Sequence, residues 1–113
     1  MALTFIKLFA PVQLPITTPN VLYTCPAAPS TTVLKNGRVR LVNTSASPVS
    51  ATLYAVPAAG SPTAANECFV QSIPATSYVD VDIPTLAAGD TLQGVAGTAS
   101  VITIHELGGV LYS

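Results

Sequence analysis

The sequence predicts an all-β domain, a single antiparallel β-sandwich or barrel of about eight short strands. Short runs in which apolar and polar side chains alternate recur at intervals of about 8–12 residues. Ten prolines and seven glycines punctuate the 113 residues, and no stretch of about 11 residues keeps a helical period free of them. This length is typical of one domain with one hydrophobic core.

The chain is expected to begin with an N-terminal arm or strand at residues 1–11, followed by a sandwich domain at residues 12–113. Residues 2–9 read ALTFIKLF, and Pro11 ends this apolar run. A secretory signal starts with a basic segment, but the cation here, Lys7, lies in the middle of the apolar residues. We therefore interpret the segment as a strand or arm.

Further strands follow at regular spacing through the expected sandwich. Val39 and Leu41 share one face of the strand RVRLVN. Arg38 and Arg40 share its other face, as the two-residue period of a strand requires. The expected strands, in order, are residues 13–17, 21–25, 37–43, 49–56, 67–73, 77–83, 91–96 and 100–107, with a tail at 110–112.

Two turns are expected between these strands. Asn36-Gly37 is typical of a two-residue hairpin turn, since both residues tolerate positive φ. It would join a short strand at residues 33–35 to the strand that starts at residue 37. Residues 87–90 read AAGD and suggest a longer turn. Asn43-Thr44-Ser45 matches an N-glycosylation sequon, but without a secretory signal it is more simply a turn after a strand.

The composition excludes several functions. Charged residues make up 8% of the chain, whereas a typical soluble domain has about 25%. The net charge of −1 argues against nucleic-acid binding, which needs a basic face. The 50% content of hydrophobic residues argues against disorder. No run of about 18 apolar residues occurs, so we expect no membrane-spanning helix.

Titratable side chains do not form a recognisable catalytic motif, so we expect no enzyme, no cofactor and no metal. His105 is the single histidine, and Cys68 is a conceivable partner that lies outside any motif. Asp80 and Asp82 point the same way from one strand, so they would either help to hold a hard cation or form a polar solvent face. Cys25 and Cys68 are expected as free thiols, with a single bridge as the alternative.

The sequence says more about contact surfaces than about catalytic or metal sites. The arm is apolar on both faces, and a strand apolar on both faces must be covered on both. Arg38 and Arg40 either pair across strands with Asp80 or Asp82 or make an intermolecular contact. The candidate contact residues are Leu3, Phe5, Ile6, Leu8, Arg38 and Arg40.

Four segments give the chain a family resemblance. They are VLYTCP (21–26), RVRLVNTSASPVSATLYAVP (38–57), LAAGDTLQGVAG (86–97) and VITIHELG (101–108). In this order they resemble the jelly-roll-like head decoration or cement proteins of tailed bacteriophages and related small virion proteins. The resemblance covers about residues 12–108, although residues 67–83 lack a matching motif. It implies a jelly-roll-like sandwich, often trimeric, that binds the major capsid protein on the capsid exterior and has no active site.

We therefore expect a structural virion protein that binds the assembled shell and stabilises it through contacts with the major capsid protein and with sister subunits. The low charge supports this hypothesis, because neutral surfaces cost less to desolvate at an interface. The alternative is a phage tail or fibre accessory module, or a host-binding or carbohydrate-binding sandwich. The scarcity of aromatic residues, at 6% with no Trp, argues against carbohydrate binding.

Overall fold

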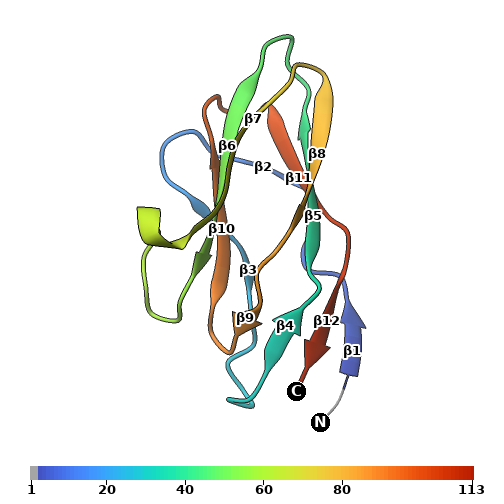
Figure 1. Ribbon diagram of the computed structural model, residues 1–113, viewed down its shortest axis with the longest axis vertical. Coiled ribbons are helices and arrows are strands. Elements are labelled where there is room, and N and C mark those ends of the chain that lie inside the picture. Colours follow the sequence, from blue (N-terminus) through green and yellow to red (C-terminus); the bar gives the residue numbers. More distant parts are fainter. Residues whose placement is uncertain (1–2) are drawn as a thin grey trace.

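The computed structural model describes residues 3–113, which form β-strands and one short 3₁₀ helix (Figure 1). In chain order, the strands are β1 (Leu3–Ile6), β2 (Val12–Gln13), β3 (Asn20–Thr24), β4 (Val33–Lys35), β5 (Arg38–Asn43), β6 (Val49–Val56), β7 (Glu67–Ile73), β8 (Ser77–Asp82), β9 (Leu86–Ala87), β10 (Thr91–Ala96), β11 (Ile102–Glu106) and β12 (Gly109–Tyr112). The 3₁₀ helix η1 spans Ala64–Asn66. Within the described chain, no helix is long and apolar enough to cross a membrane.

The strands pair antiparallel in three groups of four, which together form two layers. The orders are β1-β12-β4-β9, β2-β11-β5-β8 and β3-β10-β6-β7. The first two groups continue one another, because each consists of the same four chain segments interrupted near the middle. We call these two groups the split sheet and the third group the continuous sheet.

The strand order is that of a jelly roll. Counting β1 with β2, β4 with β5, β8 with β9 and β11 with β12 leaves eight strands in chain order. The split sheet then has the order first, eighth, third and sixth, and the continuous sheet has the order second, seventh, fourth and fifth. The predicted all-β, antiparallel, jelly-roll-like sandwich of about eight strands is therefore confirmed.

The split sheet is interrupted where the expected hairpin turn at Asn36-Gly37 lies, and that expectation is wrong. Asn36 has a φ of 57°, but Gly37 does not have a positive φ, and a type I′ turn needs positive φ at both residues. The chain therefore bends and continues in nearly the same direction, so β4 and β5 do not pair. Hydrogen bonds from Arg38 N to Gly108 O (3.1 Å) and from Ile83 N to Gly37 O (2.8 Å) join the two halves.

The core lies between the two sheets and follows the predicted alternation. Val39 and Leu41 are fully buried, whereas Arg38 and Arg40 point to the outside. The expected strands at residues 49–56, 67–73 and 91–96 have the same bounds as β6, β7 and β10. The largest fully buried apolar side chains are Leu14, Leu34, Leu41, Leu53, Ile73, Leu86, Leu92, Ile102 and Ile104.

The sequon asparagine connects the two sheets at one end of the sandwich. Asn43 is 1% exposed, and its Nδ2 donates to the carbonyl oxygens of Ser47 (2.9 Å) and Ile73 (3.0 Å). Its Oδ1 accepts from the backbone N–H and the hydroxyl of Ser45, at 2.9 and 2.8 Å. Asn43 belongs to β5 and Ile73 to β7, so one amide links the split sheet to the continuous sheet. The expectation of a turn after a strand is confirmed.

Candidate interaction surface

Two strongly exposed apolar side chains lie on the outer face of the split sheet, where β1, β12 and β4 are neighbours (Figure 1). Leu3 is 56% exposed and Phe5 is 80% exposed. Leu3 lies opposite Tyr112, which lies opposite Val33, and Phe5 lies opposite Val110. Directly opposite residues of an antiparallel pair point to the same face. We call Leu3, Phe5, Val33, Val110 and Tyr112 the β1–β12 patch.

The surroundings of the β1–β12 patch are also poor in charge. Lys35, opposite Val110, is the charged residue of these three strands. A hollow of about 380 Å³ beside the patch is lined by Phe5, Ile6, Asn36, Leu107, Gly108, Gly109 and Val110. A second hollow of about 310 Å³ is lined by Thr31, Val33, Lys35 and Tyr112. The patch is thus uneven as well as apolar, and a partner could fill its hollows with side chains of its own.

The four contact residues expected in the N-terminal segment separate into two groups. Leu3 and Phe5 lie on the outer face. Ile6 is half-buried against the core, and Leu8 is only 7% exposed and belongs to the core. The backbone N–H of Leu8 donates to Glu106 Oε1 at 3.1 Å, which fixes the chain as it leaves β1. One face of the segment is therefore covered by the domain itself, and the surface of Leu8 is not available to a partner.

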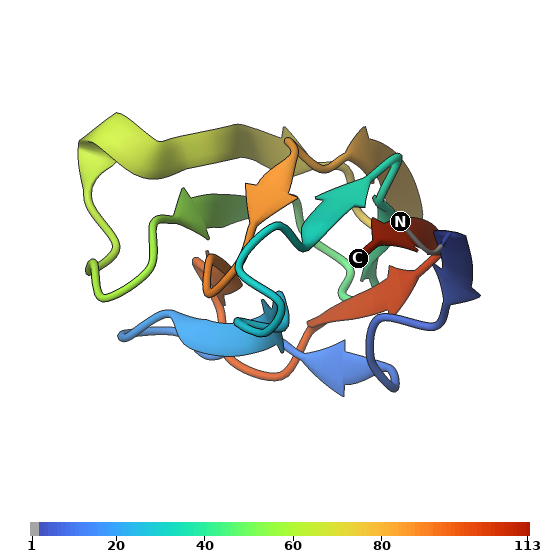
Figure 2. The same ribbon diagram turned by 90° about the horizontal axis from the view of Figure 1, so that it is seen from below.

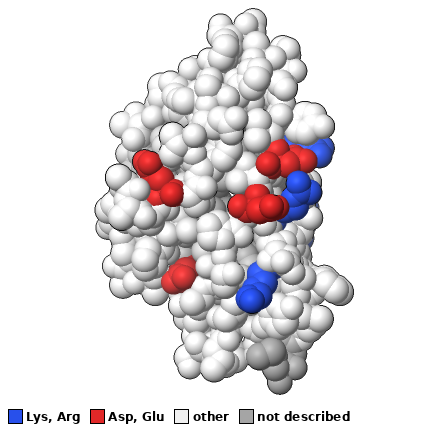
Figure 3. Space-filling model, in the orientation of Figure 1, with Lys and Arg blue, Asp and Glu red and all other residues white. Residues whose placement is uncertain are grey.

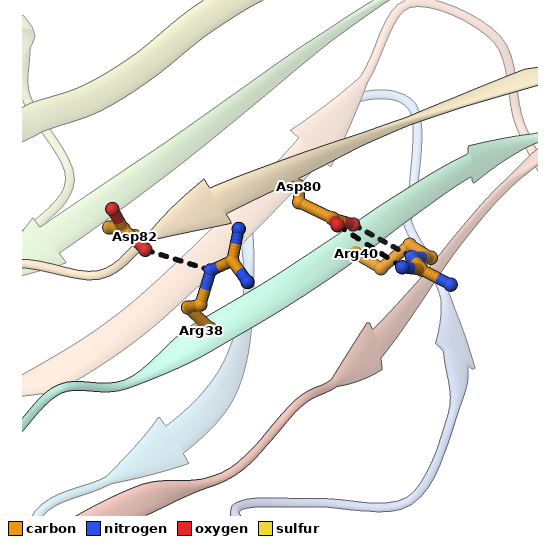
Figure 4. Close-up of polar contacts among 4 residues, drawn as sticks. All are labelled: Arg38, Arg40, Asp80 and Asp82. Atoms are coloured by element: carbon orange, nitrogen blue, oxygen red, sulfur yellow. Dashed lines mark hydrogen bonds and ion pairs between the residues drawn. The ribbon is translucent and has the colours of Figure 1, made fainter.

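The two expected arginines pair with aspartates of the neighbouring strand β8 (Figure 4). Arg40 is bidentate to Asp80, with its Nε 2.7 Å from Oδ1 and its Nη2 3.1 Å from Oδ2. Arg38 Nε lies 3.0 Å from Asp82 Oδ1. The hydrogen bond from the Arg40 guanidinium lowers the pKa of the Asp80 carboxyl. The cross-strand pairing that the sequence offered as one alternative is present.

These ion pairs make the outer face of β5 and β8 electrically neutral. The guanidinium of Arg40 also lies over the ring of Tyr78, 4.4 Å from its centroid, which is a cation–π distance. Tyr78 is 55% exposed, but the arginine occupies one side of its ring. A sugar could not stack on that side, so this tyrosine does not favour the carbohydrate-binding alternative.

The outer face of the continuous sheet is a second neutral surface. Its four strands contain a single charged residue, Glu67, at the start of the edge strand β7. Val70 is 63% exposed and lies opposite Thr52, and Val21 is 57% exposed on the other edge strand. Figure 3 shows the molecule from the side of the edge strands β7 and β8, where charged atoms gather in a few places and most of the surface is uncharged.

The remaining candidates for chemistry lie apart or are already engaged. His105 is on β11 of the split sheet, opposite Arg40, whereas Cys68 is on β7 of the continuous sheet. Cys25 and Cys68 are both free thiols, and burial raises the pKa of each. Within residues 3–113, no group of three or more His, Cys, Asp or Glu is placed to hold a metal ion.

No protein family and no curated protein matches the chain. Among solved structures, the chain is similar to one in the structure of infectious bursal disease virus strain Gx, with 10% identity and a TM-score of 0.47. It is also similar to one in the T13 particle of that virus, with 10% identity and a TM-score of 0.38. Both alignments cover 97% of this chain, which spans about 31% and 30% of the two larger chains.

Proposed function

We propose that this chain is a structural protein of a virus particle, a decoration or cement protein that binds the assembled shell from the capsid exterior. Its partners are the major capsid protein and further copies of itself, and the resemblance to bacteriophage decoration proteins suggests a trimer. The observation that carries the proposal is the β1–β12 patch, where exposed apolar side chains lie on an almost uncharged surface. Contiguous exposed apolar surface is typical of interaction sites.

The mechanism of attachment is burial of this patch. Full burial of a Leu or Phe side chain is worth about 1.5–3 kcal/mol. With Leu3 56% exposed and Phe5 80% exposed, covering both adds roughly 2–4 kcal/mol per copy. A micromolar complex needs about 8 kcal/mol, so these two side chains supply a substantial part of the affinity. Several copies bound to one shell, or linked in an oligomer, multiply weak contacts.

The ion pairs on the neighbouring face contribute in a different way. Arg38 and Arg40 are already paired with Asp82 and Asp80, so a partner need not supply charges to neutralise them. A surface whose charges are compensated within the chain can be placed close to another protein without leaving an unpaired charge. We infer that the arginines keep this face compatible with the shell, while the apolar patch supplies the attraction.

Co-sedimentation with shells that lack this protein tests the proposal. The double variant Leu3→Ala and Phe5→Ala should bind at least about tenfold more weakly, since about 1.4 kcal/mol corresponds to tenfold. Its thermal unfolding should stay close to that of the wild type, because both side chains are mostly exposed. The matched control is Val70→Ala, which removes a 63% exposed side chain from the other sheet.

The outcomes separate the candidates for the binding face. Retained binding by Val70→Ala, together with weakened binding by the double variant, supports attachment through the β1–β12 patch. Equal binding by the double variant and the wild type would contradict this attachment. Absence of wild-type binding to any shell preparation would contradict the proposed function itself.

A further inference from the structure

The edges of the continuous sheet carry features that block pairing with another strand. β3 is one edge, and it lies between Pro19 and Pro26. β7 is the other edge, and it begins with Glu67 and ends before Pro74. Prolines, charged side chains and irregular register are the usual means by which natural proteins protect edge strands. Both strands also show a register shift against their partners.

Most of the split sheet is protected in the same way. β8 carries Asp80 and Asp82, and β9 is only two residues long. On the opposite edge, β2 also has two residues and lies between Pro11 and Pro15. These strands offer a partner either charge or too little length.

β1 is the exception among the described edges. Its four residues, Leu-Thr-Phe-Ile, include no proline and no charge, and its register with β12 has no shift. Among the described residues, β12 is the only strand that pairs with it. Figures 1 and 2 agree that no other strand lies on its outer side. Its protective features are its shortness and Lys7, which follows it directly, so a pairing strand would need support from side chains.

We propose that β1 pairs antiparallel with β1 of a second copy of this chain, across a two-fold axis perpendicular to the split sheet. In this register, Thr4 lies opposite Thr4 of the second copy. Leu3 then lies opposite Phe5 of the second copy, and Phe5 lies opposite its Leu3. The contact joins the two split sheets into one continuous sheet. This inference does not depend on shell binding, and it gives self-association a two-fold form in place of the trimer that the resemblance suggests.

The side chains of β1 suit this register. Residues directly opposite in an antiparallel pair point to the same face, and Leu3 and Phe5 share the outer face of each copy. Thr–Thr pairs are favourable across strands, and each Leu3–Phe5 pair would bury apolar surface. The two β1–β12 patches would meet and form one larger apolar surface.

A second copy is the occupant that the charges favour. β1 has no ionised side chain that could repel its symmetry mate. The charges nearest to the contact are Lys7, one residue beyond β1, and Lys35 on β4. The two copies of Lys7 would lie at opposite ends of the contact, about 20 Å apart along the strand direction, and five strand spacings, about 24 Å, would separate the two copies of Lys35. Both distances exceed the Debye length of about 8 Å at physiological salt. A two-fold contact is also self-complementary, so one strand satisfies both sides of the interface.

Cysteine cross-linking tests the register directly. Opposite Cα atoms in an antiparallel pair are about 4.5–5.5 Å apart, which lies within the range of about 4.4–6.8 Å that a disulfide spans. Thr4→Cys, in a Cys68→Ser background, should therefore form a covalent dimer under mild oxidation, seen as a doubled mass that reduction reverses. The matched control is Gln71→Cys in the same background, since Gln71 is an exposed residue of the protected edge β7. Failure of Thr4→Cys to cross-link, or equal cross-linking by Gln71→Cys, overturns the proposal.

A substitution that introduces a charge at the two-fold axis tests the contact without cross-linking. Thr4→Lys would place two like charges directly opposite each other, which disfavours pairing. Light scattering should give twice the 11.5 kDa chain mass for the wild type and the single mass for Thr4→Lys, and circular dichroism should show the same β-rich spectrum for both. A monomeric or trimeric wild type, or a dimeric Thr4→Lys variant, contradicts the two-fold contact. Because Thr4→Lys keeps Leu3 and Phe5, weakened self-association with retained shell binding separates this inference from the proposed function.

Discussion

Replacing Asn43 with alanine should destabilise the domain more than any exposed polar substitution. The Asn43 amide donates to Ser47 O at 2.9 Å and to Ile73 O at 3.0 Å. It accepts from the N–H and the hydroxyl of Ser45 at 2.9 and 2.8 Å. The side chain is 1% exposed, so water cannot replace these partners without opening the end of the sandwich.

The expected cost follows from these four hydrogen bonds. Each contributes about 0.5–1.5 kcal/mol, so their loss lowers the free energy of unfolding by about 2–6 kcal/mol. The whole domain is expected to have about 5–15 kcal/mol. Since 1 kcal/mol shifts the Tm of a domain near this size by about 4–8 °C, the Tm should fall by at least about 8 °C.

Asn66 provides a matched control for this substitution. Its amide also makes two hydrogen bonds, accepting from Thr63 N at 2.9 Å and donating to Ser61 O at 3.1 Å. These bonds lie on the solvent-exposed 3₁₀ helix η1 and the residues before it, where water replaces lost partners, so Asn66→Ala should cost less than about 1 kcal/mol. Thermal and denaturant unfolding measure both variants. Equal Tm shifts for the two variants, or an unchanged Tm for Asn43→Ala, would refute the reasoning.

Three further predictions follow from other side chains. Because Asn43 is buried, incubating the folded protein with an oligosaccharyltransferase and its glycan donor should leave the mass unchanged, and a glycan added to the folded protein would contradict the burial. Arg40 lowers the pKa of Asp80. The ionised Asp80 carboxylate therefore stabilises the fold at neutral pH, and this stabilisation is lost as the pH falls through the lowered pKa. The Tm of Asp80→Asn should fall less steeply toward acid pH than the Tm of the wild type. Burial raises the pKa of both thiols, so an alkylating reagent should react slowly with them at neutral pH. The fully buried Cys25 should react more slowly than Cys68. Rapid labelling of Cys25 would show that the core opens.

The strands that depend on local pattern were predictable. Alternation fixes which residues of a strand face inward, and prolines or polar residues mark its ends. This explains why the bounds of β6, β7 and β10 agree with the prediction. It also explains why Arg38 and Arg40 face Asp82 and Asp80, since both strands place their charged residues on the outer face.

Features that depend on distant pairing were not predictable in the same way. Asn36-Gly37 has the residues of a hairpin turn, but the strands on either side of it pair with β12, β9, β11 and β8 instead. No local property of residues 33–43 reports those partners, which lie far along the chain. The burial of Asn43 has the same origin, because Ile73 comes from another strand. The sequence shows only a sequon at that position.

The N-terminal segment shows how far the candidate surface could be predicted from the sequence. Its alternation shows two apolar faces but not which of them the domain covers. Packing decides this: Ile6 and Leu8 contact the core, and Leu3 and Phe5 remain outside. The open face became identifiable only when β12 and β4 were seen to extend it with Val110, Tyr112 and Val33.

The few charged side chains of the chain lie mostly where other groups of the same chain bind them. Arg38 and Arg40 bind Asp82 and Asp80. Two of the remaining acids accept backbone hydrogen bonds, Glu106 from Leu8, and Asp90 from Ala58 and Ala87. Six of the nine charged side chains are thus engaged within the chain. A partner that covers this domain meets few uncompensated charges, so apolar fit and backbone pairing, rather than countercharge, must decide what binds.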